Sequence, residues 1–127
     1  MIKVANQYFQ SGRYKDALEA YASAMSYLTV LGDTPPPPAP ENIEYDEFAS
    51  DRAGWALLAT LHSNRAMTYL KLGTDLKYSR LVVEDCNAAL RIDPTLPKAL
   101  FRRGTAFAKL KRWREACDDF SSPYLGD

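Results

Sequence analysis

Apolar residues recur along this chain at the three- and four-residue spacing that places them on one face of an α-helix. One such series is Ala17, Leu18, Tyr21, Ala24 and Leu28. The pattern stops at glycines 12, 32 and 73 and at prolines 94 and 97, where turns are expected. Sustained alternation typical of a β-strand is absent from the sequence. We therefore expect an all-α chain with helices near 2–11, 14–31, 51–72, 77–92, 96–109 and 112–121.

A pattern of small and aromatic residues repeats within these helices. The first copy consists of Ala5, Tyr8, Ala17, Tyr21 and Ala24. The last copy, at the same offsets of 3, 12 and 16 from its first member, consists of Gly104, Phe107, Ala116 and Phe120. The middle copy, with about four residues inserted within 73–80, consists of Ala66, Tyr69, Val82, Cys86, Ala89 and Pro94. Small residues let two antiparallel helices approach closely and the aromatic ring fills the space beside them, so the pattern predicts three helical hairpins.

The repeat resembles the tetratricopeptide repeat, a helix–turn–helix unit of about 34 residues. Residues 87–94, with the sequence NAALRIDP, are close to the ending of the family's repeat. The resemblance implies one domain over residues 1–127, in which three repeats stack as an α-solenoid with a concave peptide groove. The expected parts are repeat 1 at about 1–33, a proline-rich linker at about 34–50, repeat 2 at about 51–94 and repeat 3 at about 95–122.

Residues 34–40, with the sequence TPPPPAP, interrupt the helical pattern because proline lacks the amide donor and clashes with the preceding turn. The segment favours polyproline II. It is either a proline-rich ligand for an aromatic groove or a stiff connector between the first two repeats. We favour the connector, because stiff proline linkers are common. Tyr45 and Phe48, which follow, are expected to pack back locally.

Composition and charge exclude several classes of protein. The chain is 46% hydrophobic and 25% charged, as in ordinary globular proteins. Its formal net charge is zero, which gives no global attraction to nucleic acid or to a membrane surface. No apolar run is long enough for membrane insertion. Cys86 and Cys117 form no CxxC pair and are expected to be small buried residues in a reducing compartment, the cytoplasm or also the nucleus.

The sequence offers no catalytic constellation. His62 has no serine, cysteine or paired carboxylate at a spacing that suggests a triad. Phosphate-binding loops, zinc-ligand spacing and dinucleotide fingerprints are also missing. We therefore expect neither an enzyme nor a cofactor or metal site. Trp55 and Trp113 occur at helical spacing and are expected to pack in the core or between repeats.

Function is expected on the concave face, where the first helices of stacked repeats turn inward. If the small residue of each first helix is position 8, the inward stripe holds positions 2, 5, 6, 9, 12 and 13. This stripe contains five basic residues and no acidic one: Lys3, Lys71, Lys98, Arg102 and Lys109. It also carries Phe9, Met67 and Phe101. Such a groove suits an acidic peptide with some apolar side chains.

Co-chaperone members of the tetratricopeptide family use a dicarboxylate clamp of Lys, Asn, Asn, Lys and Arg. It binds the C-terminal Glu-Glu-Val-Asp of heat-shock proteins 90 and 70, whose last aspartate offers two carboxylates to amide and cationic donors. The resemblance implies that Asn6 and Asn64 are the clamp asparagines and that Lys98 and Arg102 are the basic pair. It implies an accessory groove of Lys3, Phe9, Met67, Lys71, Phe101 and Lys109.

The chain departs from the clamp pattern at one position. The family's first lysine would stand four residues before Asn6, where this chain has Ile2. Either Lys3 substitutes from a different angle, or position 2 reflects where the chain begins. The other matches also have a simpler interpretation, in which Asn64 and Arg65 are routine polar residues and the Lys98–Arg102 pair is a solvated face. The alternative function is a general scaffold that binds another acidic peptide or partner within a larger assembly.

The end of the last repeat carries a further expectation. Ser121, Ser122 and Pro123 stop the final helix, and no amphipathic capping helix follows. We expect either a domain cut from a longer protein or self-association through the uncapped C-terminal repeat. A disordered or strand-paired segment at 124–127 is compatible with both.

Overall fold

The computed structural model describes residues 2–39, 41 and 44–126, and within them the chain is helical with no strand. The α-helices of this described part are α1 (Ile2–Gln10), α2 (Tyr14–Ser26), α3 (Ala49–Leu72), α4 (Leu76–Ile92), α5 (Pro97–Lys109) and α6 (Trp113–Phe120). Two short 3-10 helices, η1 (Tyr27–Leu31) and η2 (Pro123–Leu125), follow α2 and α6. The all-α prediction is confirmed, with helix ends within two residues of those expected if η1 is counted as the end of the second helix.

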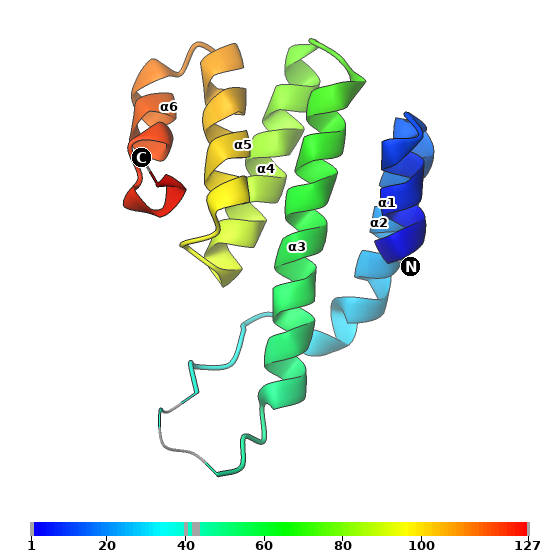
Figure 1. The fold of residues 1–127 in the computed structure, drawn as a ribbon, viewed down its shortest axis with the longest axis vertical. Coiled ribbons are helices and arrows are strands. Elements are labelled where there is room, and N and C mark those ends of the chain that lie inside the picture. Colours follow the sequence, from blue (N-terminus) through cyan, green and yellow to red (C-terminus); the bar gives the residue numbers. More distant parts are fainter. Residues whose placement is uncertain (1, 40, 42–43, 127) are drawn as a thin grey trace.

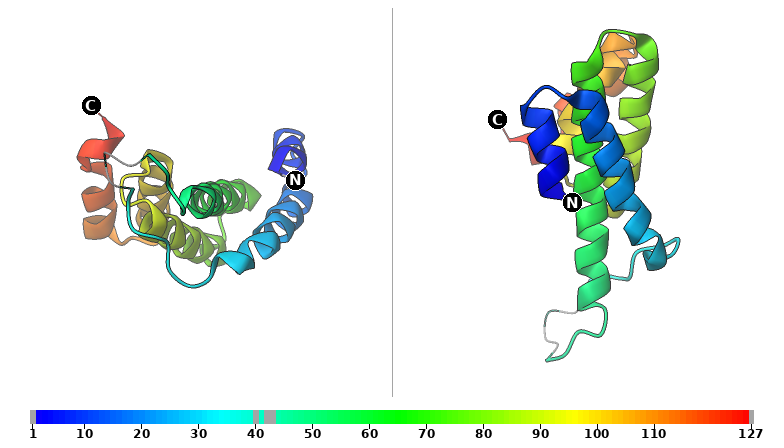
Figure 2. Two further views of the ribbon diagram at one scale, coloured as in Figure 1. Left: turned by 90° about the horizontal axis from the view of Figure 1, so that it is seen from below. Right: turned by 90° about the vertical axis from the view of Figure 1, so that its right-hand side faces the viewer.

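Consecutive helices pair as three antiparallel hairpins that stand side by side (Figure 1). The hairpins are joined by contacts of α2 with α3 and of α4 and α3 with α5. Seen from below, α1, α3 and α5 line the inner side of a curved array, and α2 and α4 line the outer side (Figure 2). This arrangement gives the three first helices a shared concave face.

The turns and close contacts of the hairpins follow from particular residues. Gly12 and Lys111 stand at equivalent places in the first and third hairpins, and both have positive φ, +78° and 61°. Asp75 caps α4 by accepting a hydrogen bond from the Lys77 amide. A Cβ on Gly104 would lie 2.7 Å from the Phe120 ring, so glycine there lets α6 pack closely against α5.

The core is built from the predicted small and aromatic residues. Around the first hairpin it contains Ala5, Ala17, Tyr21 and Ala24, together with Leu61 from α3. From α3 to α6 its most deeply buried members are Ala66, Val82, Cys86, Ala89, Ala99 and Ala106. Because Leu61 packs into the first cluster and Ala66 into the second, α3 joins the two parts of the core.

The proline-rich segment connects η1 to α3. We call residues 35–38 the proline strap. Arg52 of α3 holds the strap by donating to the Pro37 carbonyl, and it also donates to the Asp46 carboxylate. The expectation that Tyr45 and Phe48 pack back was wrong for Tyr45, which is 80% exposed. Phe48 is also exposed, but the Arg52 guanidinium lies over its ring.

The sequence predicted burial of both tryptophans and of both cysteines. In each pair, one residue is buried and the other is exposed. Trp55 and Cys86 are buried, as predicted. Trp113 is 62% exposed, and Cys117 is exposed too. Both lie on α6, which packs against α5 and leaves its other face to solvent, so helical spacing alone did not imply burial there. Both cysteines are free thiols.

The remaining expectations concern the membrane and the C-terminal segment. In the described part of the chain, no helix is long and apolar enough to cross a membrane. Residues 123–125 form η2, which contacts α5, so the expectation of a disordered or strand-paired segment was wrong for residues 124 and 125. Residue 127 lies outside the described residues.

Candidate functional site

The structure brings three of the four predicted clamp residues into one pocket. Asn6 of α1, Asn64 of α3 and Arg102 of α5 line a small open pocket of about 80 Å³. The remaining lining residues are Phe9, Tyr21 and Met67. All except Tyr21 come from the first helices of the hairpins, so the pocket lies on the concave face. Helix packing therefore brings together polar side chains that are nearly a hundred residues apart in the sequence.

Asn6 is oriented by the helix behind it. The Tyr21 hydroxyl donates a 2.6 Å hydrogen bond to Asn6 Oδ1, and Tyr21 itself is buried. Burial raises the pKa of Tyr21, although the charge of Arg102 lowers it in part, so the phenol remains a neutral donor. With its oxygen engaged, the Asn6 amide has its two N–H groups left to donate to a pocket ligand.

Arg102 lines the pocket from α5. It is only 9% exposed, and its Nη1 donates to Ser63 O at 2.7 Å and to Ser63 Oγ at 2.8 Å. Burial lowers the pKa of Arg102, because the charged guanidinium has lost much of its hydration. Among the described residues, no carboxylate lies within ion-pair distance of it. The alternative of a solvated face is therefore wrong for Arg102.

The neighbouring arginines are different. Arg65 donates twice to Asp85, at 2.8 and 2.6 Å, and Arg103 donates twice to Asp119, at 2.8 and 2.7 Å. His62 Nδ1 also lies 2.9 Å from Asp85 Oδ1, so this histidine contacts the same carboxylate within the fold. These pairs join the two helices of a hairpin, so their arginines are occupied within the fold.

The sequence analysis missed these ion pairs, although a signal was present. Each arginine directly precedes the small residue of its first helix, Ala66 or Gly104. Their partners Asp85 and Asp119 also occupy equivalent positions. Each directly precedes the aromatic position of its second helix, which is Cys86 or Phe120. Two equivalent positions with opposite charges in adjacent repeats indicate a repeated contact. The interpretation of Arg65 as a routine polar residue was therefore wrong.

The predicted lysines of the site do not line this pocket. Lys98 is exposed on α5, one turn before Arg102. Lys3, Lys71 and Lys109 are likewise exposed on α1, α3 and α5. None of these four lysines has an ion-pair partner among the described residues. They add positive charge to a face whose central pocket has no acidic lining residue.

Two apolar residues of the predicted groove have different surroundings. Phe9 lines the pocket, and its ring lies 5.5 Å from that of Tyr14. Phe101 is 56% exposed, and its ring lies 5.8 Å from Phe120.

Ile2, at the position of the missing lysine, packs against the core of the first hairpin, while Lys3 is exposed. The described residues contain no cluster of His, Cys, Asp and Glu that would hold a metal ion.

Comparison with known proteins gives relatives that are much longer than this chain. No protein-family profile matches it. The human mitochondrial import receptor subunit TOM70 is 28% identical over 117 residues, which are 92% of this chain and 15% of the relative. The human peptidyl-prolyl cis-trans isomerase FKBP4 is 34% identical over 116 residues, 89% of this chain and 21% of the relative. The chain thus spans about a fifth or less of these proteins.

A solved structure is similar over most of its length. The second TPR of Spaghetti (RPAP3), bound to the HSP90 peptide SRMEEVD, matches with a TM-score of 0.60 and 28% sequence identity. The match covers 91% of this chain and 79% of that one. The two chains therefore share a fold, which confirms the predicted stack of three helical hairpins.

Proposed function

We propose that this tetratricopeptide-repeat domain is an adaptor that binds the acidic C-terminal tail of the HSP90 chaperone through a carboxylate clamp. The observation that carries the proposal is Arg102, a largely buried guanidinium without a carboxylate partner in the described part of the chain. It shares its pocket with Asn6 and Asn64. A carboxylate supplied by a ligand would satisfy Arg102 as Asp119 satisfies Arg103.

The chemistry of a free C-terminal aspartate suits this pocket. Its main-chain and side-chain carboxylates are two acceptor groups close together, and the two asparagines and Arg102 are donors from three different helices. Lys98, exposed one turn away, adds charge without being desolvated. The RPAP3 domain is bound to a peptide that ends in Glu-Glu-Val-Asp, which supports this choice of ligand.

The test is a comparison of one peptide with and without its terminal charge. Isothermal titration with SRMEEVD and with its C-terminally amidated form should show at least tenfold weaker binding of the amide, because one carboxylate is lost. The tail of heat-shock protein 70, which ends in the same four residues, is the second ligand to measure. Equal binding of the free and amidated peptides would show that the groove does not recognise a C-terminus and would favour a general scaffold.

Lys98 offers a variant that leaves the fold intact, because its side chain is exposed. Lys98→Ala should weaken binding about threefold to tenfold. Lys15 is the matched control, an exposed lysine on α2 of the outer side. Lys15→Ala should bind the peptide like the wild type. A similar loss in both variants would indicate general charge attraction rather than a clamp.

A further inference from the structure

The sequence contains two hydroxyl residues that directly precede a proline, Thr34 and Ser122. The Ser122 hydroxyl is already used within the fold, because it caps η2 by accepting a hydrogen bond from the Tyr124 amide. Thr34 is exposed and stands immediately before the proline strap, where the following proline disfavours a helical backbone. An exposed threonine before proline in a non-helical segment has the form that proline-directed protein kinases select in their substrates.

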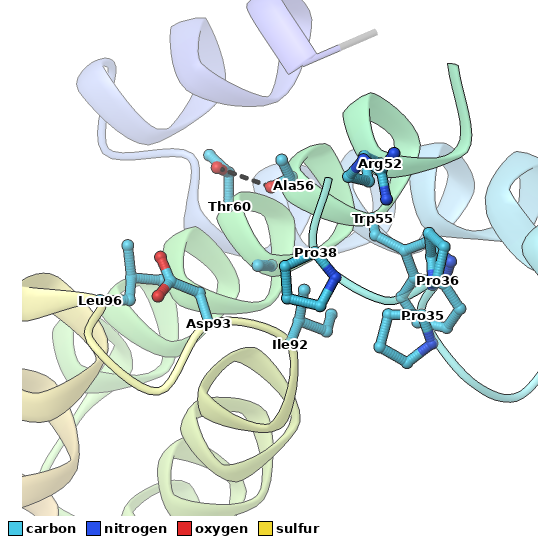
Figure 3. A pocket seen from close by; sticks show the side chains of 11 residues that line it. Pro35, Pro36, Pro38, Arg52, Trp55, Ala56, Thr60, Ile92, Asp93 and Leu96 are labelled. Carbon is cyan, nitrogen blue, oxygen red and sulfur yellow. Dashed lines mark hydrogen bonds between the residues drawn. The ribbon is translucent and has the colours of Figure 1, made fainter. Parts of the chain in front are cut away.

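The proline strap gives Thr34 a defined place on the domain. Pro35 and Pro36 lie beside Trp55 of α3 (Figure 3). Trp55 is buried, and Arg52, one turn earlier on the same helix, donates to the strap's backbone. Because proline also has little conformational freedom of its own, these contacts fix the start of the strap against α3. Thr34 is therefore held close to the body of the domain with its side chain accessible.

A small pocket of about 140 Å³ adjoins Thr34. Its lining includes both neighbours of Thr34, Asp33 and Pro35, together with Arg91 from the last turn of α4. Arg91 is exposed and has no ion-pair partner among the described residues, Asp33 included. His62 also lines the pocket, but its Nδ1 already contacts a carboxylate of α4. An uncommitted guanidinium thus shares a pocket with the residues on either side of Thr34.

We propose that Thr34 is a phosphorylation site for a proline-directed protein kinase and that Arg91 binds the phosphate. The γ-phosphoryl group of ATP moves to Thr34 Oγ1: the bond from phosphorus to the ADP oxygen breaks, a bond to Oγ1 forms, and the hydroxyl proton is released. The phosphate carries more charge than the carboxylate of Asp33, and a planar guanidinium can bind two of its oxygens.

The position of the phosphate makes Arg91 necessary. Because α4 ends at Ile92, the carbonyls of its last turn disfavour an anion nearby, so the attraction has to come from the Arg91 side chain. The bond would join the inserted segment to the second hairpin. With Arg52 already bound to the strap from α3, phosphorylation would fasten the strap to both helices of that hairpin.

The first experiment tests the site of modification. The folded chain is incubated with a cyclin-dependent protein kinase and MgATP, and the product is analysed by intact mass and peptide mapping. We expect one phosphate per chain, located at Thr34. Thr34→Ala should abolish its incorporation, and Ser122→Ala, the matched control, should leave it unchanged. If the folded chain stays unmodified, or if the phosphate is found on Ser122 instead, Thr34 is not the site and the proposal is wrong.

The second experiment tests the role of Arg91 by ³¹P NMR titration of the phosphorylated chain. The second pKa of a phosphothreonine is about 6, and an adjacent guanidinium lowers it by favouring the dianion. We expect this pKa to be about 0.5–1 pH unit lower in the wild type than in Arg91→Ala. Arg80→Ala removes another exposed arginine of α4, outside the pocket lining, and should keep the lowered pKa.

Two results would overturn the assignment of Arg91. Equal pKa values in the wild type and in Arg91→Ala would mean that the phosphate stays in solvent. The same rise in Arg80→Ala as in Arg91→Ala would mean that the phosphate senses only the overall charge of the domain. Both arginines are exposed, so neither substitution removes a buried contact that the fold needs.

Discussion

The Tyr21 hydroxyl donates a 2.6 Å hydrogen bond to Asn6 Oδ1, across the interface between α2 and α1. Tyr21 occupies the aromatic position of the repeat and is almost fully buried, so its ring belongs to the core while its hydroxyl reaches the pocket lined by Asn6, Asn64 and Arg102. One residue thus couples hairpin packing to the orientation of an amide in this pocket. The fold itself therefore orients the Asn6 side chain.

Tyr21→Phe should therefore weaken peptide binding while the core packing is kept. The ring remains and only the hydroxyl is lost, so Asn6 becomes free to rotate. We expect about threefold to tenfold lower affinity for the free peptide by isothermal titration, equivalent to one hydrogen bond. In an Asn6→Ala background the same substitution should have no further effect. An equal loss in both backgrounds would mean that Tyr21 acts on the ligand without Asn6.

Arg102→Met should separate binding from stability. The substitution removes a buried cation whose hydrogen-bond partner among the described residues is Ser63 alone, so the cost of burying the charge is lost together with these hydrogen bonds. We expect the free energy of unfolding to change by no more than about 1 kcal/mol. Affinity for the free peptide should fall at least about thirtyfold, as charge-assisted bonds are lost. Urea denaturation and peptide titration on the same preparation measure both. A folded variant that binds normally would contradict the clamp.

Asp85→Asn should have the opposite effect. Asp85 is buried, and it accepts hydrogen bonds from Arg65 that join α3 to α4. The asparagine removes the charge that neutralises Arg65, so the free energy of unfolding should fall by about 2–3 kcal/mol. Peptide affinity at a temperature where the variant is folded should stay within twofold of wild type. A large loss of affinity would show that this pair also supports the pocket.

The two thiols should differ in reactivity. Cys86 is buried in the core, and Cys117 is exposed on α6. Burial, aided by the charge of Asp85, raises the pKa of Cys86 from 9.0 to about 12. Ellman's reagent at pH 8 should therefore react quickly with one thiol in the native protein and with both in denaturant. Rapid reaction of both in the native state would contradict the burial of Cys86.

The raised pKa of Cys86 also predicts a dependence of stability on pH. The folded state holds the thiol proton more tightly than the unfolded chain, whose thiol has the ordinary pKa of 9.0. This contribution to stability is complete below about pH 9 and is lost as the pH rises from 9 toward 12. Cys86→Ala should show a shallower loss of stability over that range in urea denaturation.

The sequence predicted the hairpins well because their signal is local. Small residues such as Ala5 and Gly104 must stand where helices meet, and their spacing is visible without a structure. The stacking of repeats then fixed which helices share a face. This is why Asn6, Asn64 and Arg102, matched only by their repeat positions, do meet in one pocket.

What the sequence could not predict depends on neighbours outside the repeat pattern. Trp55 and Trp113 both occur at helical spacing with neighbouring apolar residues. Trp55 is buried because the proline strap and α4 lie beside it, whereas Trp113 is exposed. A pocket between the proline strap and α3 arises because residues 35–38 lie against that helix, which no periodicity describes. The burial of Arg102 was also missed, since an arginine on an inward stripe suggests exposure unless its backbone partner on Ser63 is known.

The last prediction concerns the position where this chain departs from the clamp pattern. Ile2 lies one turn before Asn6 on α1 and packs against the first hairpin, whereas Lys3 is exposed and rotated by about 100° around the helix. Ile2→Lys should tighten binding of the free peptide about threefold to tenfold, because a lysine there is on the turn next to Asn6.

This gain should come with a small loss of stability, about 1 kcal/mol, because Ile2 gives up part of its packing. Lys3→Ala should change affinity less than twofold. If Lys3→Ala instead weakened binding as strongly as Lys98→Ala, Lys3 would already supply the missing charge, and Ile2→Lys would then add little. Measuring the two variants with the free and the amidated peptide assigns the cation, because only a true clamp lysine loses its effect when the terminal carboxylate is blocked.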